Sequence, residues 1–170
     1  MAARLRVIDG TQEAEDVLAS AKEILAARDL MSMATGSVDF GPHANSAFFA
    51  FDDDLVLWFV SERTTRHSIN VAGDPRMSAS IFLDPPTYGE GLRGLQLWGT
   101  AREAEPHERQ VALSVLQGRF PTFAQDPVVR ERFLTAQLPS VFYRIEVGNL
   151  TVLDEPRFGR RIYIPAAVDR

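Results

Sequence analysis

The hydrophobic residues of this chain follow one spacing near its start and another over most of its length. Between residues 11 and 29, apolar side chains recur every three or four positions, which predicts an amphipathic helix. Thr11 stands where a capping side chain is expected, and Glu13, Glu15 and Asp16 suit the positive end of the helix dipole. After this helix the apolar runs are short and separated by turn residues, which is typical of β-strands.

The remaining pattern predicts a mainly β protein with a few peripheral helices. The expected strands are residues 30–35, 45–51, 55–61, 77–83, 92–103, 141–147, 150–153 and 161–164. Helices are expected at 65–72, 106–118 and 126–139. The residues that suit their ends are Gly73, Pro106, Gly118, Asp126 with Pro127, and Pro139. Because most strands connect by short hairpins, we expect one domain over residues 1–170, an antiparallel and closed or nearly closed β-barrel.

Two short motifs resemble ligand sites but are better explained as turns. Residues 89–94 match the dinucleotide pattern GxGxxG, yet they lead into an alternating strand and not into a helix. A hairpin loop is therefore expected there. The three acidic residues 52–54 lie between two apolar strands, which favours a solvated turn over a cation site.

Composition narrows the function classes. The 170 residues include no cysteine, which excludes disulfides, zinc–thiolate sites and cysteine nucleophiles and suits a reducing, cytoplasmic location. The first ten residues form no apolar run of the kind that a signal peptide or membrane helix needs. A net charge of −5 gives no general attraction for nucleic acid. The three histidines are scattered, so no metal site is expected.

Candidate binding chemistry is concentrated where a predicted strand ends and a predicted helix begins. Ser61, Arg63, Thr65, Arg66 and His67 gather within this short stretch. Hydroxyl groups, guanidinium groups and a helix N-terminus all favour a bound phosphate. A capped surface helix with solvated arginines would produce the same pattern, and the residues alone leave both interpretations open.

At this segment the chain resembles the pyridoxamine 5′-phosphate oxidase-like split-barrel family. Residues 59–67 have the spacing of the family's F-Y-T-N-x-x-S-R-K pattern, with His67 in place of its lysine. The likeness is to an uncharacterised bacterial branch and not to the vitamin B6 oxidase itself. It extends to Gly94-Leu95-Gln96-Leu97-Trp98-Gly99, Arg119-Phe120-Pro121 and Phe158-Gly159-Arg160.

The resemblance implies a Greek-key-like split β-barrel that binds FMN at the interface of a homodimer. By that likeness Ser61, Thr65 and Arg66 hold the flavin phosphate together with Arg63 and His67. The isoalloxazine ring then lies beside the strand segment Asn45-Ser46-Ala47, where the family oxidase carries an arginine in place of Asn45. Trp98 and Arg160, with Phe158, are expected to reach the flavin of the partner subunit, and packing in the barrel or the interface is the alternative role for Trp98.

The function implied by the resemblance is that of an FMN-dependent oxidoreductase acting on a small molecule. The sequence assigns no catalytic acid or base. Two alternatives stay open: a split barrel that binds deazaflavin or haem, with His43 or His67 ligating iron, and a non-catalytic module that stores or senses a cofactor. Neither nucleic acid nor a membrane is an expected partner.

Overall fold

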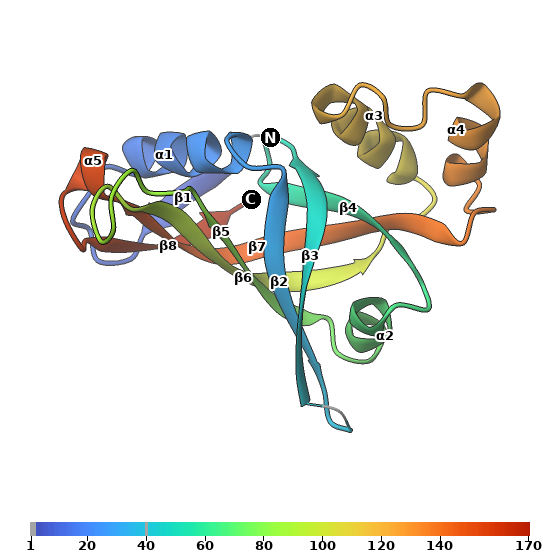
Figure 1. The fold of residues 1–170 in the computed structure, drawn as a ribbon, viewed down its shortest axis with the longest axis horizontal. Helices are drawn as coiled ribbons and strands as arrows, with labels where there is room; N and C mark the ends of the chain where they lie inside the picture. Colours follow the sequence, from blue (N-terminus) through green and yellow to red (C-terminus); the bar gives the residue numbers. More distant parts are fainter. Residues whose placement is uncertain (1–2, 40) are drawn as a thin grey trace.

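The computed structural model describes residues 3–39 and 41–170 and shows one antiparallel β-sheet with helices around it (Figure 1). The strands are β1 (Arg4–Val7), β2 (Leu30–Ser37), β3 (Gly41–Phe51), β4 (Val56–Glu62), β5 (Arg76–Phe82), β6 (Arg93–Glu103), β7 (Ser140–Asp154) and β8 (Tyr163–Asp169). Their order across the sheet is β1-β8-β7-β4-β3-β2-β5-β6.

The sheet closes on itself through its longest strand, β7. On one side β7 pairs with β4, and on the other it pairs with β6. Ile145 accordingly has Leu57 and Ala101 as its two neighbours in register. Six strands thus form a closed barrel, and β8 and β1 extend the sheet beyond it. The predicted mainly β, antiparallel split-barrel fold is confirmed.

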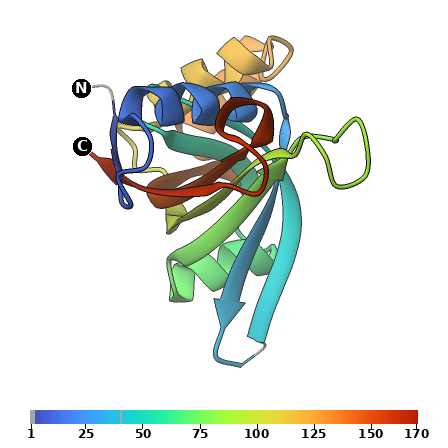
Figure 2. The same ribbon diagram turned by 90° about the vertical axis from the view of Figure 1, so that its left-hand side faces the viewer.

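Five helices of the described residues lie outside the barrel wall (Figure 2). They are α1 (Ala14–Ala26), α2 (Arg66–Gly73), α3 (Arg109–Arg119), α4 (Pro127–Leu134) and α5 (Glu155–Phe158). The apolar face of α1 closes one end of the barrel, with Val17, Ile24 and Leu25 in the main core. Helices α3 and α4 form a lobe over β3, β4 and β7.

This lobe has a hydrophobic core of its own. Residues 56–59 of β4 are all buried, because one face of the strand points into the barrel and the other is covered by the lobe. Trp58 and Phe142 pack outward against Leu116 and Phe133. The continuous apolar run in β4 is therefore explained by burial on both faces.

The predicted helices exist, but several of their ends differ. Thr11 does not cap α1: its hydroxyl donates to the Asp9 carboxylate, and the helix begins at Ala14. Gly73 is the last residue of α2 and has no left-handed backbone. In α4 the Asp126 carboxylate accepts from the N–H groups of Val128 and Val129, so the predicted start is confirmed.

The ends of α3 and α4 also differ from those expected from the sequence. Pro106 belongs to a turn that precedes α3, which begins at Arg109. Gly118 lies inside that helix, and α4 ends at Leu134, well before Pro139. In each case the pattern located the helix but not its terminal residue.

The two expected strands at 141–147 and 150–153 are a single strand. The chain does not break at Gly148; instead the β6–β7 register shifts between Trp98 and Gly99. At this irregularity the backbones approach closely, since a Cβ on Gly99 would lie 2.0 Å from the carbonyl oxygen of Glu146. A β-bulge therefore lies where the break between the two strands was expected.

Both motifs that were interpreted as turns are turns. Residues 89–92 lie in a loop with a bridge between Thr87 and Glu90, and the last two residues of the motif begin β6. In the acidic turn the Asp52 carboxylate accepts from the N–H groups of Asp54 and Val56 and from the Trp58 indole. No three His, Cys, Asp or Glu side chains gather as metal ligands among residues 3–39 and 41–170. In the same part of the chain, no helix combines the length and the apolar character that crossing a bilayer requires.

Candidate functional site

The barrel opens where β3 and β4 separate. These strands pair only between residues 49–51 and 57–59. Before residue 49, β3 continues alongside β2 alone, whereas β4 continues alongside β7 into the turn that starts α2. The end of β4 and the first turn of α2 therefore face the free side of β3.

Three hydroxyl groups and one imidazole meet at this opening. Ser61 Oγ lies 2.7 Å from His67 Nε2 and 3.0 Å from Thr65 Oγ1. Thr65 Oγ1 is 2.9 Å from Ser68 Oγ, which donates back to Ser61 at 3.3 Å. We call Ser61, Thr65, His67 and Ser68 the hydroxyl cluster. Because hydroxyls both donate and accept, the cluster can turn several O–H groups toward one acceptor.

His67 is the ionisable member of the hydroxyl cluster. Its ring is parallel to that of His43, with 6.5 Å between the ring centroids, and also contacts Phe59. Burial, together with the charge of His43, lowers the pKa of His67 from its ordinary value. Near neutral pH the cluster therefore contains a neutral imidazole.

Tyr143 supports the hydroxyl cluster from inside the barrel. Its ring stacks on that of Phe59, with 5.0 Å between the ring centroids. The residue is only 4% exposed, and its hydroxyl is hydrogen-bonded to Ser68. Burial raises the pKa of Tyr143. Tyr143 did not stand out in the sequence, because it reaches the cluster only when β7 pairs with β4. Ser68 was missed although its contacts with Ser61 and Thr65 are local.

Next to the hydroxyl cluster lies a largely apolar cavity of about 500 Å³, which we call the hollow. It is lined by Ser46, Ala47, Phe48, Val60, Ser61, His67, Leu116, Phe120, Thr122 and Phe123. None of these side chains is a carboxylate, a lysine or an arginine. The hollow thus suits a flat, uncharged ring whose polar end reaches the hydroxyl cluster.

The far wall of the hollow comes from the α3–α4 lobe. The rings of Phe120 and Phe48 are nearly perpendicular, with 5.8 Å between their centroids. Phe123 packs against Phe133 and Phe142 of the lobe core. No role for these aromatic residues was predicted, since they are distant from β3 along the chain.

The structure brings four of the predicted site residues, Ser46, Ala47, Ser61 and His67, to the hollow. Thr65 joins them through the hydroxyl cluster. Asn45 lies between them and His43 on β3, and its buried Oδ1 atom has no hydrogen-bond partner. An unpaired buried acceptor is costly, and Asn45 itself does not line the hollow.

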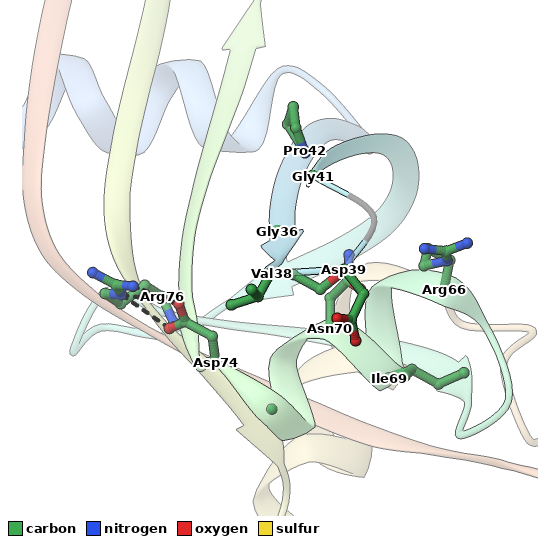
Figure 3. A pocket seen from close by; sticks show the side chains of 12 residues that line it. Gly36, Val38, Asp39, Gly41, Pro42, Arg66, Ile69, Asn70, Asp74 and Arg76 are labelled. Atoms are coloured by element: carbon green, nitrogen blue, oxygen red, sulfur yellow. Dashed lines mark hydrogen bonds and ion pairs between the residues drawn. The ribbon is translucent and has the colours of Figure 1, made fainter.

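Neither of the two arginines that are predicted to bind the phosphate belongs to the hydroxyl cluster. The Arg63 guanidinium forms a two-fold ion pair with Glu103, at 2.6 and 2.7 Å. Arg66 begins α2 and lines a different groove of about 870 Å³, between α2 and the β2–β3 hairpin (Figure 3). At the other end of that groove Arg76 binds Asp74 and lowers the pKa of that carboxyl to about 2.

The last two predicted residues lie outside the hollow of their own chain. Trp98 is 44% exposed on the outer face of β6. Arg160 follows α5 and donates to the carbonyl of Gly89. Any contact between these side chains and a ligand in the hollow therefore requires a second copy of the chain.

Comparison with known proteins identifies the fold. No protein-family profile matches the sequence, and no curated protein matches it. Among solved structures, the haem-binding protein from Mycobacterium smegmatis matches with a TM-score of 0.67 and 15% identity, covering 89% of this chain. The chain spans only 57% of that protein's length.

Two further structures match over most of their own length. A pyridoxamine 5′-phosphate oxidase candidate from Listeria innocua has a TM-score of 0.61 and 19% identity, covering 80% of this chain and 97% of that one. The haem storage protein HutZ from Vibrio cholerae has a TM-score of 0.60 and 17% identity, covering 80% and 94%. At these identities the likeness establishes architecture alone. The chain therefore has the split-barrel fold of the pyridoxamine 5′-phosphate oxidase-like and haem-binding proteins.

Proposed function

We propose that the chain binds FMN, with the phosphate at the hydroxyl cluster and the isoalloxazine ring in the hollow. The observation that carries this proposal is that the polar hydroxyl cluster adjoins the largely apolar hollow. Ser61, Thr65 and Ser68 supply O–H donors at the N-terminus of α2, and an uncharged, partly aromatic cavity begins beside them. A phosphate and a flat ring joined by a short chain match this arrangement.

The polar atoms of the site also fit a flavin. The unpaired Oδ1 of Asn45 is an acceptor, and an isoalloxazine ring carries a ring N–H that needs one. The neutral His67 contributes a hydrogen bond and no full charge, so the phosphate is held mainly by hydroxyls and the helix dipole. Arg63 would add charge only by exchanging its Glu103 partner, and Arg66 would add it from the first turn of α2.

The proposed activity is that of a flavin-dependent oxidoreductase acting on a small, uncharged molecule in the cytoplasm. A bound flavin supplies hydride or electron transfer, and the protein orients the ring and limits access to it. In this chain the orienting surfaces are the β3 segment 45–48 and the lobe wall around Phe120. His67 is the ionisable side chain that lines the hollow.

A homodimer forms part of the same proposal. The outer face of β3, β2 and β5 carries short side chains in two rows, Ser46, Ser32 and Ser80, then Ala44, Ala34 and Ser78, which end on β6 in the longer Gln96 and Trp98. Larger apolar residues lie beyond these rows, with Phe48 at 63% and Leu30 at 48% exposure. Since Ser46 and Phe48 belong both to this face and to the hollow, a second copy docked there would border the ligand. In such a dimer we expect Trp98 and Arg160 to reach the flavin of the other copy.

Haem is the second candidate. The observation that favours it is the parallel pair His43 and His67, with a neutral imidazole at the edge of an apolar cavity. Neutral imidazoles are the usual haem ligands. Two of the structures with the same fold are described as haem-binding and haem-storage proteins. Deazaflavin would use the hollow as a flavin does.

The test begins with the absorbance spectrum of the purified protein, followed by titration with FMN, riboflavin and haemin. Flavin bands, or saturable quenching of FMN fluorescence at low micromolar concentration, would support the proposal. A haem spectrum, abolished in both His43→Ala and His67→Ala, would favour the second candidate. Flavin binding without turnover of any reductant or acceptor would indicate a store or sensor. Failure to bind any of the three would overturn the proposal.

A further inference from the structure

Arg119 joins three parts of the molecule. It is the last residue of α3, and its side chain is 13% exposed. The guanidinium donates to the carbonyls of Leu25 at 2.9 Å and Ala26 at 3.3 Å, and to that of Arg28. It also forms an ion pair with Asp29. Arg119 therefore satisfies carbonyl groups that the end of α1 leaves without helical partners.

The flat face of the same guanidinium lies among aromatic rings. Its central carbon is 4.8 Å from the ring centroid of Phe49, 5.9 Å from that of Phe51 and 5.8 Å from that of Phe120. Phe49 and Phe51 belong to β3, the strand that forms the other wall of the hollow. Arg119 does not line the hollow itself.

These contacts fix the end of α3 next to Phe120, which lines the hollow. Phe120 follows α3 directly, and its ring meets the edge of Phe48 from the opposite wall. The core of the α3–α4 lobe reaches β3 at Ala50, and the Arg119 contacts with Phe49 and Phe51 join the end of α3 to the same strand. Among the described residues, Arg119 makes such contacts with both α1 and β3.

We propose that Arg119 is a positioning residue. It keeps Phe120 close to β3 and so sets the affinity of the hollow for the ring of its ligand. The proposal rests on the proposed function for the identity of that ring. It assigns a role to the Arg119-Phe120-Pro121 motif, which the hydroxyl cluster does not use.

The experiment compares Arg119→Met and Arg119→Lys with Arg109→Met. Arg109 is a matched control, because it lies on the same helix and its guanidinium donates to a helix-terminal carbonyl, that of Leu134, away from the hollow. Affinity for FMN and for riboflavin, which lacks the phosphate, is measured by fluorescence titration at a temperature where every variant is folded.

Arg119→Met is expected to weaken both ligands by the same factor, about 3- to 30-fold, which corresponds to one cation–π arrangement. Arg119→Lys is expected to weaken them less. Arg109→Met should leave both affinities unchanged even where it lowers the melting temperature. A purely structural role predicts no change in affinity while the protein is folded, so unchanged affinities in Arg119→Met would overturn the proposal.

A second measurement separates this inference from the function on which it rests. Amide resonances of Phe48, Phe120 and Phe123 are compared in ligand-free wild type and variants. Displaced resonances in Arg119→Lys, absent in Arg109→Met, would support the positioning role even if the wild type binds no flavin. Unmoved resonances would refute it. If Arg119→Met does not fold, the Arg119→Lys comparison decides.

Discussion

Ser61 is hydrogen-bonded to every other member of the hydroxyl cluster and also lines the hollow. If it donates to a phosphate, Ser61→Ala should weaken FMN binding about tenfold or more, the scale of a hydrogen bond to a charged group. Riboflavin affinity should change little, because that ligand has no phosphate. Fluorescence titration with both ligands checks this.

Thr64→Ala is the control for Ser61→Ala. Thr64 lies in the same turn and is exposed, with its hydroxyl directed to the Glu62 carboxylate. It should bind both ligands as the wild type does. If Ser61→Ala reduced riboflavin and FMN affinity equally, the phosphate would have to lie elsewhere.

His67 makes stability depend on pH in a defined direction. Because burial lowers its pKa in the folded protein, the unfolded chain takes up a proton more readily below the ordinary value of 6.5. The contribution is present above that value and is lost as the pH falls. The free energy of unfolding should therefore decrease from pH 7 to pH 5, and His67→Asn should flatten this decrease.

Denaturant unfolding at several pH values measures the effect. His107→Asn serves as the control, since the His107 side chain is 74% exposed, and it should leave the slope as it is. His43→Asn removes the neighbouring charge and should reduce the slope in part. An unchanged slope in His67→Asn would show that other groups cause the pH dependence.

At the scale of elements, closure of the barrel depends on the bulge between β6 and β7. Gly99→Ala would place a methyl group against the Glu146 carbonyl and should destabilise the protein by about 1–3 kcal/mol, the usual cost of overpacking. Gly148→Ala is the matched control, because the nearest atom to its Cβ is 3.8 Å away. Chemical denaturation of both variants tests the difference; equal stabilities would mean that the bulge relaxes freely.

The elements also show what sequence patterns can predict. Periodicity located every long helix and all strands of the barrel wall, because each has one face in a core. It missed β1, which is four residues long and pairs only with β8. It divided β7 at Gly148, because a glycine that permits a bulge looks the same in a sequence as a glycine that makes a turn.

The candidate site was predictable only in part for a related reason. Ser61, Thr65 and His67 are close in sequence, so their clustering at a strand–helix junction is visible in the chain itself. Phe120 and Tyr143 reach the same place through tertiary packing, which no local pattern encodes. The Arg63–Glu103 ion pair, between residues 40 positions apart, is likewise invisible before the fold is known.

For the whole molecule, the proposed dimer can be tested by one charge on the outer sheet face. Ser80 lies in one of the two rows of short side chains. Ser80→Arg should prevent close approach of a second copy, because an arginine buried without a partner is costly. Sedimentation should then show a monomer, and FMN affinity should fall with it.

Ser114→Arg is the control for this change. Ser114 is exposed on α3, outside the sheet face. This variant should keep the oligomeric state and the affinity of the wild type. A wild-type protein that is itself monomeric yet binds FMN would remove the dimer from the proposal and leave the site.

The place of β7 in the sheet has a consequence for how the chain is made. Until this strand emerges from the ribosome, β4 and β6 each present an unpaired edge, and more than three-quarters of the chain has already been synthesised. Exposed strand edges invite pairing with other chains. Closure also needs contacts between residues far apart in sequence, which form slowly. Nascent chains that stall before Ser140 should therefore be the species most prone to aggregate and most dependent on chaperones.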